Sequence, residues 1–163
     1  MPAENKAGSA LTVTTPSDRE ILMTRLFAAP RPLVFEAWTD PKYVSRWLLG
    51  PEGWTMPVCE IDLRPGGAWR FVWRKSDGQE MAMTGVYREV TPPERVVHTE
   101  RWGPDWPETI NTLTFIEKDG KTTCSLAVLY PSKEARDTAL KTGMEDGVAV
   151  SFDRLDVLLR TMA

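Results

Sequence analysis

The sequence lacks the features that would place the protein in a membrane or on a nucleic acid. Its apolar runs are all shorter than the ~20 residues that a membrane-spanning helix needs. Acidic and basic residues are mixed along the chain, with a net charge of −3. Because there is neither a basic stripe nor a polybasic tail, we expect no nucleic-acid partner and no membrane insertion. The first residues also lack the charged start and apolar middle of a signal peptide, so we expect a cytoplasmic protein.

Histidine and cysteine are scarce, which restricts the chemistry that the chain can carry. His98 is the only histidine, so a Ser–His or Cys–His nucleophilic pair would have to use it, and no nucleophile motif surrounds it. Cys59 and Cys124 lie far apart, and we expect two reduced, buried thiols, with a disulfide between them as the alternative. These residues do not form a usual metal-ligand set. We therefore expect no catalytic constellation, no metal and no cofactor.

Glu60 and Asp62 are a candidate acid–base pair. Glu60 and Asp62 are two residues apart and would share one face of a strand. Paired carboxylates can act as acid and base. Arg64, Arg70 and Arg74 are close in sequence, however, so we expect a solvated ion-pair face instead.

The chain length of 163 residues suits one domain, which at this size buries about 70% of the surface of its unfolded chain. Residues 1–18 are small, polar and without pattern, and we expect a flexible N-terminal tail there. A single domain is expected over residues 19–160. Seven tryptophans suit either a bulky core or the wall of a cavity, and composition does not decide between them.

Two short helices are expected after a first strand at residues 19–27. Pro32 suits the first turn of one helix, in which apolar residues follow at helical spacing. Asp40 and Pro41 suit the N-cap and the first position of the other helix. The Gly50-Pro51-Glu52-Gly53 segment ends it.

The middle of the chain changes to a period of two, which predicts strands. Six strands are expected, at residues 56–63, 68–74, 82–90, 95–102, 109–116 and 122–130. In the second of them, Trp69, Phe71 and Trp73 would face the core and Val72 the solvent. Turn residues separate the strands, and Gly66 or Gly67 should take a positive φ. Consecutive strands joined by tight turns are antiparallel.

A long amphipathic helix is expected from Ser132, its N-cap, to Arg160. Gly143 and Gly147 weaken its middle, so a bend is expected there. Its apolar stripe consists of Leu140, Met144, Val148, Phe152, Leu155 and Leu159. This helix is the only element long and apolar enough to cover one face of the sheet, which predicts an α+β fold.

Short phrases occur in a fixed order over about residues 19–160. They are Ala29-Pro30, Val34-Phe35, Ala37-Trp38-Thr39-Asp40-Pro41, Arg46-Trp47, Gly50-Pro51, Ile61-Asp62-Leu63-Arg64-Pro65-Gly66-Gly67, Gly85-Val86-Tyr87, Pro93-Glu94-Arg95, and Gly143-Met144 with Gly147 and Leu155. In this order they resemble the homologues of the ATPase activator of the heat-shock protein 90 chaperone. That family belongs to the START-like (SRPBCC) superfamily. The resemblance implies a helix-grip fold, in which a curved antiparallel sheet wraps around a long C-terminal helix.

The chain departs from the family pattern at two places. The family usually has Trp-Trp before its Gly/Pro turn, whereas here Trp47 is followed by Leu48-Leu49. The family also often has Trp where this chain has Val148 in the last helix. Loss of a large side chain there would enlarge any space beneath the helix.

The resemblance implies a deep cavity between sheet and helix but no single reaction, because fold does not give function. We expect the protein to bind a small apolar molecule in that cavity. One alternative is an enzyme acting on such a ligand, of the cyclase, dehydratase or hydrolase type. A second alternative is a chaperone-associated interaction module. A protein partner or a homodimer is left open.

The inward-facing side chains are the candidate wall of this cavity. Tyr87, His98 and Asn111 would be the few polar groups that orient a ligand among apolar neighbours. The alternative is that these side chains simply fill a close-packed core. The candidates are Trp69, Phe71, Trp73, Tyr87, His98, Asn111, Leu113, Phe115, Leu126, Val128, Met144, Val148, Phe152 and Leu155.

Overall fold

The computed structural model describes residues 11–162, and residues 1–10, the larger part of the expected N-terminal tail, lie outside this range. Along the chain the elements are β2 (Thr12–Thr14), β3 (Glu20–Phe27), α1 (Arg31–Thr39), α2 (Pro41–Trp47), β4 (Trp54–Ile61), β5 (Ala68–Lys75), β6 (Glu80–Thr91), β7 (Arg95–Glu100), β8 (Thr109–Lys118), β9 (Lys121–Leu129), α3 (Lys133–Lys141) and α4 (Met144–Met162). The expected α+β class is confirmed, with element bounds that shift by one to a few residues.

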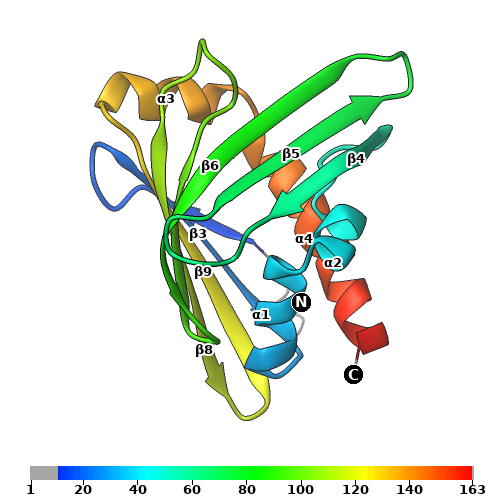
Figure 1. Cartoon of the computed structure of the whole chain (residues 1–163). Helices are drawn as coiled ribbons and strands as arrows, with labels where there is room; N and C mark the ends of the chain where they lie inside the picture. Colours follow the sequence, from blue (N-terminus) through cyan, green and yellow to red (C-terminus); the bar gives the residue numbers. More distant parts are fainter. Residues whose placement is uncertain (1–10, 163) are drawn as a thin grey trace, which may run out of the picture.

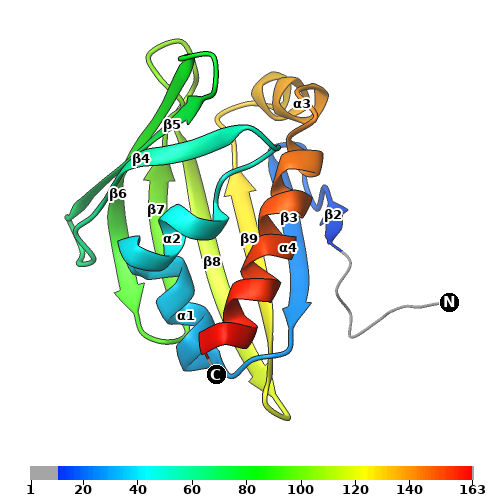
Figure 2. The same ribbon diagram turned by 90° about the vertical axis from the view of Figure 1, so that its right-hand side faces the viewer.

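The strands form one antiparallel sheet of eight strands in the order β2-β3-β9-β8-β7-β6-β5-β4. Strands β4 to β9 follow one another as a meander, as the tight turns predicted, and β3 joins the sheet beside β9. The sheet curves, and α4 crosses its concave face with α1 and α2 beside it (Figures 1 and 2). This is the arrangement expected of a helix-grip fold.

Local capping chemistry fixes where the helices begin. The Asp40 carboxylate accepts a hydrogen bond from the backbone N–H of Lys42 at 3.0 Å, and Pro41 opens α2. Ser132 accepts one from the N–H of Ala135 at 3.1 Å at the start of α3. Both N-caps are as predicted. Within residues 11–162, none of the helices is long and apolar enough to cross a membrane.

The expected single C-terminal helix is wrong, because the chain breaks between α3 and α4. Gly143 has a φ of +78° directly after the end of α3, and a left-handed glycine at this position terminates a helix. Gly147, by contrast, stays inside α4, where a Cβ would lie 3.5 Å from Pro51 Cδ. The long helix that crosses the sheet is therefore α4, while α3 packs Ala139 against Ile21 and Val128 at one end of the sheet.

The two edges of the sheet are irregular. At one edge, Thr12–Thr14 form the short strand β2 against β3, although a tail was expected for these residues. At the other edge, the pairing of β4 with β5 shifts register between Thr55 and Val58, and Pro57 lies in this gap. Proline cannot donate to a strand ladder and is tolerated at sheet edges and bulges.

The two faces of β5 differ as expected, except at Val72. Trp69, Phe71 and Trp73 are all buried on the concave side. Val72 was expected to face solvent but is only 6% exposed. Its same-face neighbours along the strand, Arg70 and Arg74, reach across to Glu60 and Glu80, so long paired side chains surround the small valine. The predicted ion-pair face is present, and it covers Val72.

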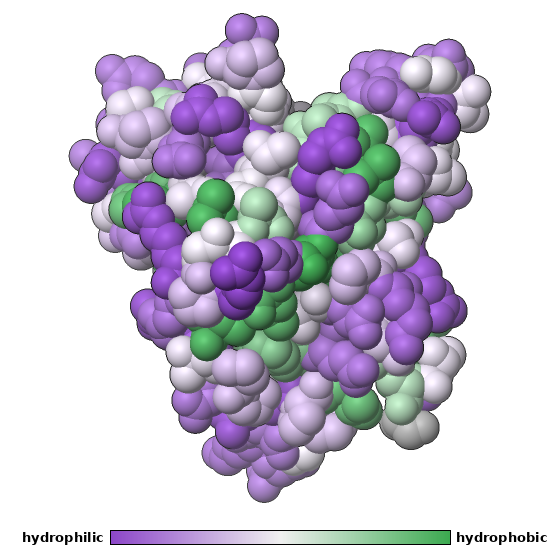
Figure 3. Space-filling view, viewed as in Figure 1, coloured by the Kyte–Doolittle hydropathy of each residue, from purple (hydrophilic) through white to green (hydrophobic). Residues whose placement is uncertain are grey.

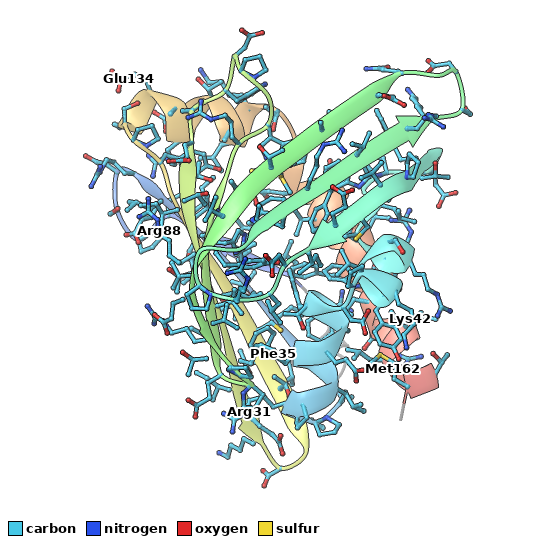
Figure 4. All side chains as sticks on the ribbon, in the orientation of Figure 1. Arg31, Phe35, Lys42, Arg88, Glu134 and Met162 are labelled. Carbon is cyan, nitrogen blue, oxygen red and sulfur yellow. The ribbon has the colours of Figure 1, made fainter. Side chains whose placement is uncertain are left out.

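The lower core is an aromatic cluster that joins α1, α2, α4 and the sheet. The Trp38 and Trp47 rings are 4.6 Å apart, and each meets Phe152 of α4 edge to face. The indole N–H of Trp47 donates to the carbonyl of Ala37 at 2.9 Å. Figure 4 shows Phe35 of α1 lying between this helix and the sheet, where its ring is 5.5 Å from that of Phe115.

Substitution at neighbouring positions of β5 should separate its two faces. Phe71→Asp buries an unpaired carboxylate in the core and should lower the free energy of unfolding by more than about 4 kcal/mol, or prevent folding. Val72→Asp places its carboxylate between Arg70 and Arg74 and should cost only about 1–2 kcal/mol. Urea unfolding measures both. An equal loss at the two positions would contradict the assignment of the faces.

The turn after Pro65 generates a second prediction. Gly66 has a φ of +86°, so Gly66→Ala should cost about 1 kcal/mol because a side chain resists this conformation. Gly67 has an ordinary φ, but a Cβ there would collide with the backbone oxygen of Asp62, so Gly67→Ala should cost more. Gly66→Asn is the control and should be milder than Gly66→Ala. Thermal melts of Gly66→Ala and Gly67→Ala that both match the wild type would refute this account of the turn.

Candidate functional site

A row of side chains crosses the concave face of the sheet from β6 to β3. The strand register pairs Tyr87 with His98, His98 with Asn111, Asn111 with Val128, and Val128 with Ile21. The outer members are apolar or aromatic, while His98 and Asn111 are polar. Adjacent pairs in such a ladder have Cβ atoms about 5 Å apart, so the histidine and the amide lie side by side.

Trp69 extends this row toward β5 because Gly85 leaves room for it. Gly85 is paired with Trp69 in the ladder, and a Cβ at Gly85 would lie 2.5 Å from Trp69 Nε1. Without that Cβ, the indole packs against His98 with ring centroids 5.5 Å apart and planes at 88°. The Tyr87 ring meets His98 from another side at 6.1 Å. The imidazole therefore lies between two aromatic rings.

Three neighbouring polar atoms on this face are buried without a hydrogen-bond partner among residues 11–162: Trp69 Nε1, His98 Nδ1 and Asn111 Oδ1. Asn111 is 0% exposed, and only its Nδ2 is used, as a donor to Thr109 Oγ1 at 2.9 Å. Buried polar atoms nearly always find partners, and leaving one unpaired costs about 1–3 kcal/mol. Their clustering defines the candidate site.

An acidic side chain borders the site. Glu100 lies two residues after His98 on the same face of β7, with its Oε2 3.8 Å from His98 Nε2, and the two side chains are 19% and 15% exposed. Its other oxygen accepts a hydrogen bond from Trp102 Nε1 at 3.1 Å. Trp102 in turn stacks on Trp73, with centroids 5.3 Å apart. Glu100 therefore connects the site to an aromatic rim.

The surroundings disfavour negative charge. Burial, and then the charge of Glu100, raise the pKa of Tyr130 to about 12. Burial also raises the pKa of Tyr87 and that of Cys124, and it raises the pKa of Cys59 to about 11. Both cysteines are free, as expected. All four pKa values are raised because burial penalises the charged forms.

The first half of α4 covers this region loosely. The buried residues of α4 begin at Ser151 and include Phe152 and Leu155, whereas Met144 and Val148 remain partly exposed. The Tyr130 hydroxyl donates to Met144 Sδ at 4.0 Å, which is a weak contact. Val148 packs against both hydrophobic clusters of the protein. The second half of the helix is thus anchored and the first half is not.

The predicted wall residues separate into two groups. Leu113, Phe115, Phe152 and Leu155 belong to the lower core with α1 and α2. The others lie higher on the concave face or under the first half of α4: Trp69, Phe71, Trp73, Tyr87, His98, Asn111, Leu126, Val128, Met144 and Val148. The aromatic residues of β5 and Tyr87 belong to the same hydrophobic cluster as Phe115 and Phe152, so the polar row lies directly beside the core.

Sequence reasoning missed Glu100, Thr109 and Tyr130. All three had a signal, since the period of two puts Glu100 on the same face as His98, Thr109 on the face of Asn111, and Tyr130 on the face of Val128. Their contacts with one another depend on strand register. Thr109 faces Glu100 across β7 and β8, and Tyr130 follows Val128 at the end of β9.

Two hollows are present on the surface, and one of them shares Trp69 and Gly85 with the candidate site. One, of about 420 Å³, is on the outer side of β4 to β7 and is lined by Glu60, Ala68, Trp69, Arg70, Thr84, Gly85, Val86, Thr99, Arg101 and Glu108. The other, of about 460 Å³, lies against the outer side of α4 and is lined by Arg46, Glu52, Val150, Asp153, Arg154, Val157, Leu158 and Thr161. Figure 3 also shows a notch between the two upper projections of the molecule, the β5–β6 hairpin and the β7–β8 connection.

Comparison with known proteins places this architecture among solved structures. A protein from Rhodobacter sphaeroides is 29% identical with a TM-score of 0.88, over 94% of this chain and 100% of that one. Protein Ms6760 from Mycobacterium smegmatis is 27% identical with a TM-score of 0.81, over 92% and 97%. An AHSA1-like protein from Aeromonas hydrophila, 17% identical with a TM-score of 0.69 over 84% and 93%, shares the fold. Curated proteins gave no match.

The family expected from the sequence phrases is confirmed. A family model described as Activator of Hsp90 ATPase homolog 1-like protein matches residues 28–160. This range runs from the end of β3 to near the end of α4 and includes Trp69, His98 and Asn111 of the candidate site. The chain belongs to the family of Activator of Hsp90 ATPase homolog 1-like proteins.

Proposed function

We propose that the protein binds a small, mainly apolar molecule on the concave face of the sheet, beneath the first half of α4. The observation that supports this most is the cluster of unpaired polar atoms on Trp69, His98 and Asn111. A ligand whose polar group reaches these atoms would supply the missing hydrogen bonds, while its apolar part would contact the surrounding aromatic and aliphatic side chains.

The energetics favour a ligand over a purely structural role. An apolar residue at each of these positions would avoid the cost of an unpaired buried group, about 1–3 kcal/mol each. Natural proteins commonly retain such costs where a functional site needs the polar group. The family fold is also one that often binds ligands.

Access to the site depends on α4. Its second half is fixed by Phe152, Leu155 and Leu159 in the lower core. Its first half follows the Gly143 break and has no fully buried residue before Ser151. Segments with few buried apolar contacts open at the lowest free-energy cost. We therefore assign ligand entry to a displacement of residues 144–150 from the sheet.

Val148→Trp tests the space beneath this half-helix. If a ligand space is present there, the indole enters it, so the variant should be at least as stable as the wild type and should bind the neutral probe N-phenyl-1-naphthylamine several-fold more weakly. Val150→Trp, on the exposed side of α4, is the matched control and should leave probe binding unchanged. Thermal melts and a fluorescence titration measure both quantities.

A loss of stability in Val148→Trp would indicate that the site is close-packed. In a close-packed site the larger side chain overfills the core and costs about 1–3 kcal/mol. A destabilised Val148→Trp variant with unchanged probe binding would contradict a ligand space at this position.

The pH dependence of stability tests whether the Tyr130 hydroxyl is buried from water. Because its pKa rises from an ordinary 10.0 to about 12, the folded protein holds the phenol proton more tightly than the unfolded chain does. This contribution to stability is complete below about pH 10 and is lost as the pH rises toward about 12. Tyr130→Phe should therefore lose less stability between pH 9 and 11 than the wild type, as measured by urea unfolding. Parallel pH profiles would contradict the burial of the hydroxyl.

A further inference from the structure

We infer that the ligand of this site carries an uncharged group that both donates and accepts hydrogen bonds, a hydroxyl above all, and not a carboxylate. This inference rests on the proposed function and adds the chemical class of the ligand. It follows from the direction in which each polar atom of the site can bond and from the charge beside them.

The orientation of the Asn111 amide is set by Thr109. The Thr109 hydroxyl donates its one hydrogen to the carbonyl of Glu100 at 3.4 Å, so its lone pairs are left to accept from Asn111 Nδ2 at 2.9 Å. This chain of donors fixes Oδ1 as the unpaired atom of the amide. Because a carbonyl oxygen only accepts, the ligand atom that meets Asn111 must carry a hydrogen.

Trp69 imposes the opposite requirement. Its unpaired Nε1 only donates, so the ligand must also offer a lone pair. His98 Nδ1 lies between these two residues and can donate or accept, depending on its tautomer. A hydroxyl offers both a hydrogen for Asn111 Oδ1 and a lone pair for Trp69 Nε1 or for His98 in its Nδ1–H form. An ether or a ketone can accept from Trp69 but leaves Asn111 Oδ1 unpaired.

Charge excludes the carboxylate as the preferred head group. A carboxylate would direct lone pairs at Asn111 Oδ1 and would be desolvated near the Glu100 side chain, whose Oε2 is 3.8 Å from His98 Nε2. Burial also raises the pKa values of the nearby Tyr87 and Tyr130 phenols, which shows that this region penalises negative charge. An anion could accept hydrogen bonds from Trp69 Nε1 and the Tyr87 hydroxyl, but it would meet no cationic partner among Trp69, Tyr87 and Asn111, and it could not donate to Asn111 Oδ1.

Displacement of N-phenyl-1-naphthylamine by three matched compounds tests the inference. 1-Octanol donates and accepts, its isomer heptyl methyl ether only accepts, and octanoate is an anion of the same chain length. One unmade hydrogen bond to a buried group predicts that octanol displaces the probe at a roughly tenfold lower concentration than either of the others. Hydrophobicity alone would favour the ether, so the expected order is diagnostic.

Two variants connect this preference to the site. Asn111→Leu keeps the side-chain size and removes the acceptor, so the preference for octanol over the ether should fall to about equality. Thr112→Val, on the opposite face of β8, is the control and should keep the preference. If Asn111→Leu does not fold, His98→Phe, which preserves the ring packing on Trp69 and Tyr87, serves in its place and should weaken octanol binding several-fold.

The outcomes separate this inference from the proposed function. Octanoate binding as tightly as octanol, or a preference that survives both site substitutions, overturns the hydroxyl assignment while ligand binding stands. Displacement by none of the compounds, together with no binding of the probe itself, overturns the proposed function and the inference with it.

Discussion

The packing of Phe152 among Trp38, Trp47 and Phe27 is the interaction on which the rest of the structure depends. It joins α4 to α1, α2 and the sheet at one end of the concave face. Because this end is closed by aromatic edge-to-face contacts, the other end need not be closed for the domain to be stable. The division of α4 into an anchored and a loosely held half follows directly. Stability and function are thereby assigned to different parts of one sheet face.

The polar row above this core is set by strand register. His98 and Asn111 come from different strands and are neighbours only because β7 and β8 pair in the observed register. Gly85 adds the third group, since the missing Cβ lets the Trp69 indole reach the imidazole. This face thus contains three unpaired polar atoms in neighbouring positions, an arrangement that packing alone does not favour.

Local patterns in the sequence predicted the meander, the inward face of β5 and the caps at Asp40 and Ser132, because these depend on neighbouring residues. Three features depend on contacts between residues that are far apart in the sequence. Gly143 and Gly147 look alike in sequence, and only the left-handed φ of the first breaks the helix. The burial of Val72 depends on its cross-strand neighbours, which the alternation within β5 does not reveal. The candidate site itself was only partly predictable: its residues were named, but the separation of Asn111 and His98 from the closed core around Phe115 required the register.

The irregular edges of the sheet limit how copies of this chain can associate. An exposed strand edge is a template for pairing with another chain. Here β2 offers only Thr12–Thr14 beyond β3, and Pro57 interrupts the ladder of β4 where its register shifts. Neither edge presents a long uninterrupted row of donors and acceptors, so continuation of the sheet from one molecule into the next is disfavoured. Over residues 11–162, side-chain surfaces therefore offer a better route to self-association of the folded protein than strand pairing does.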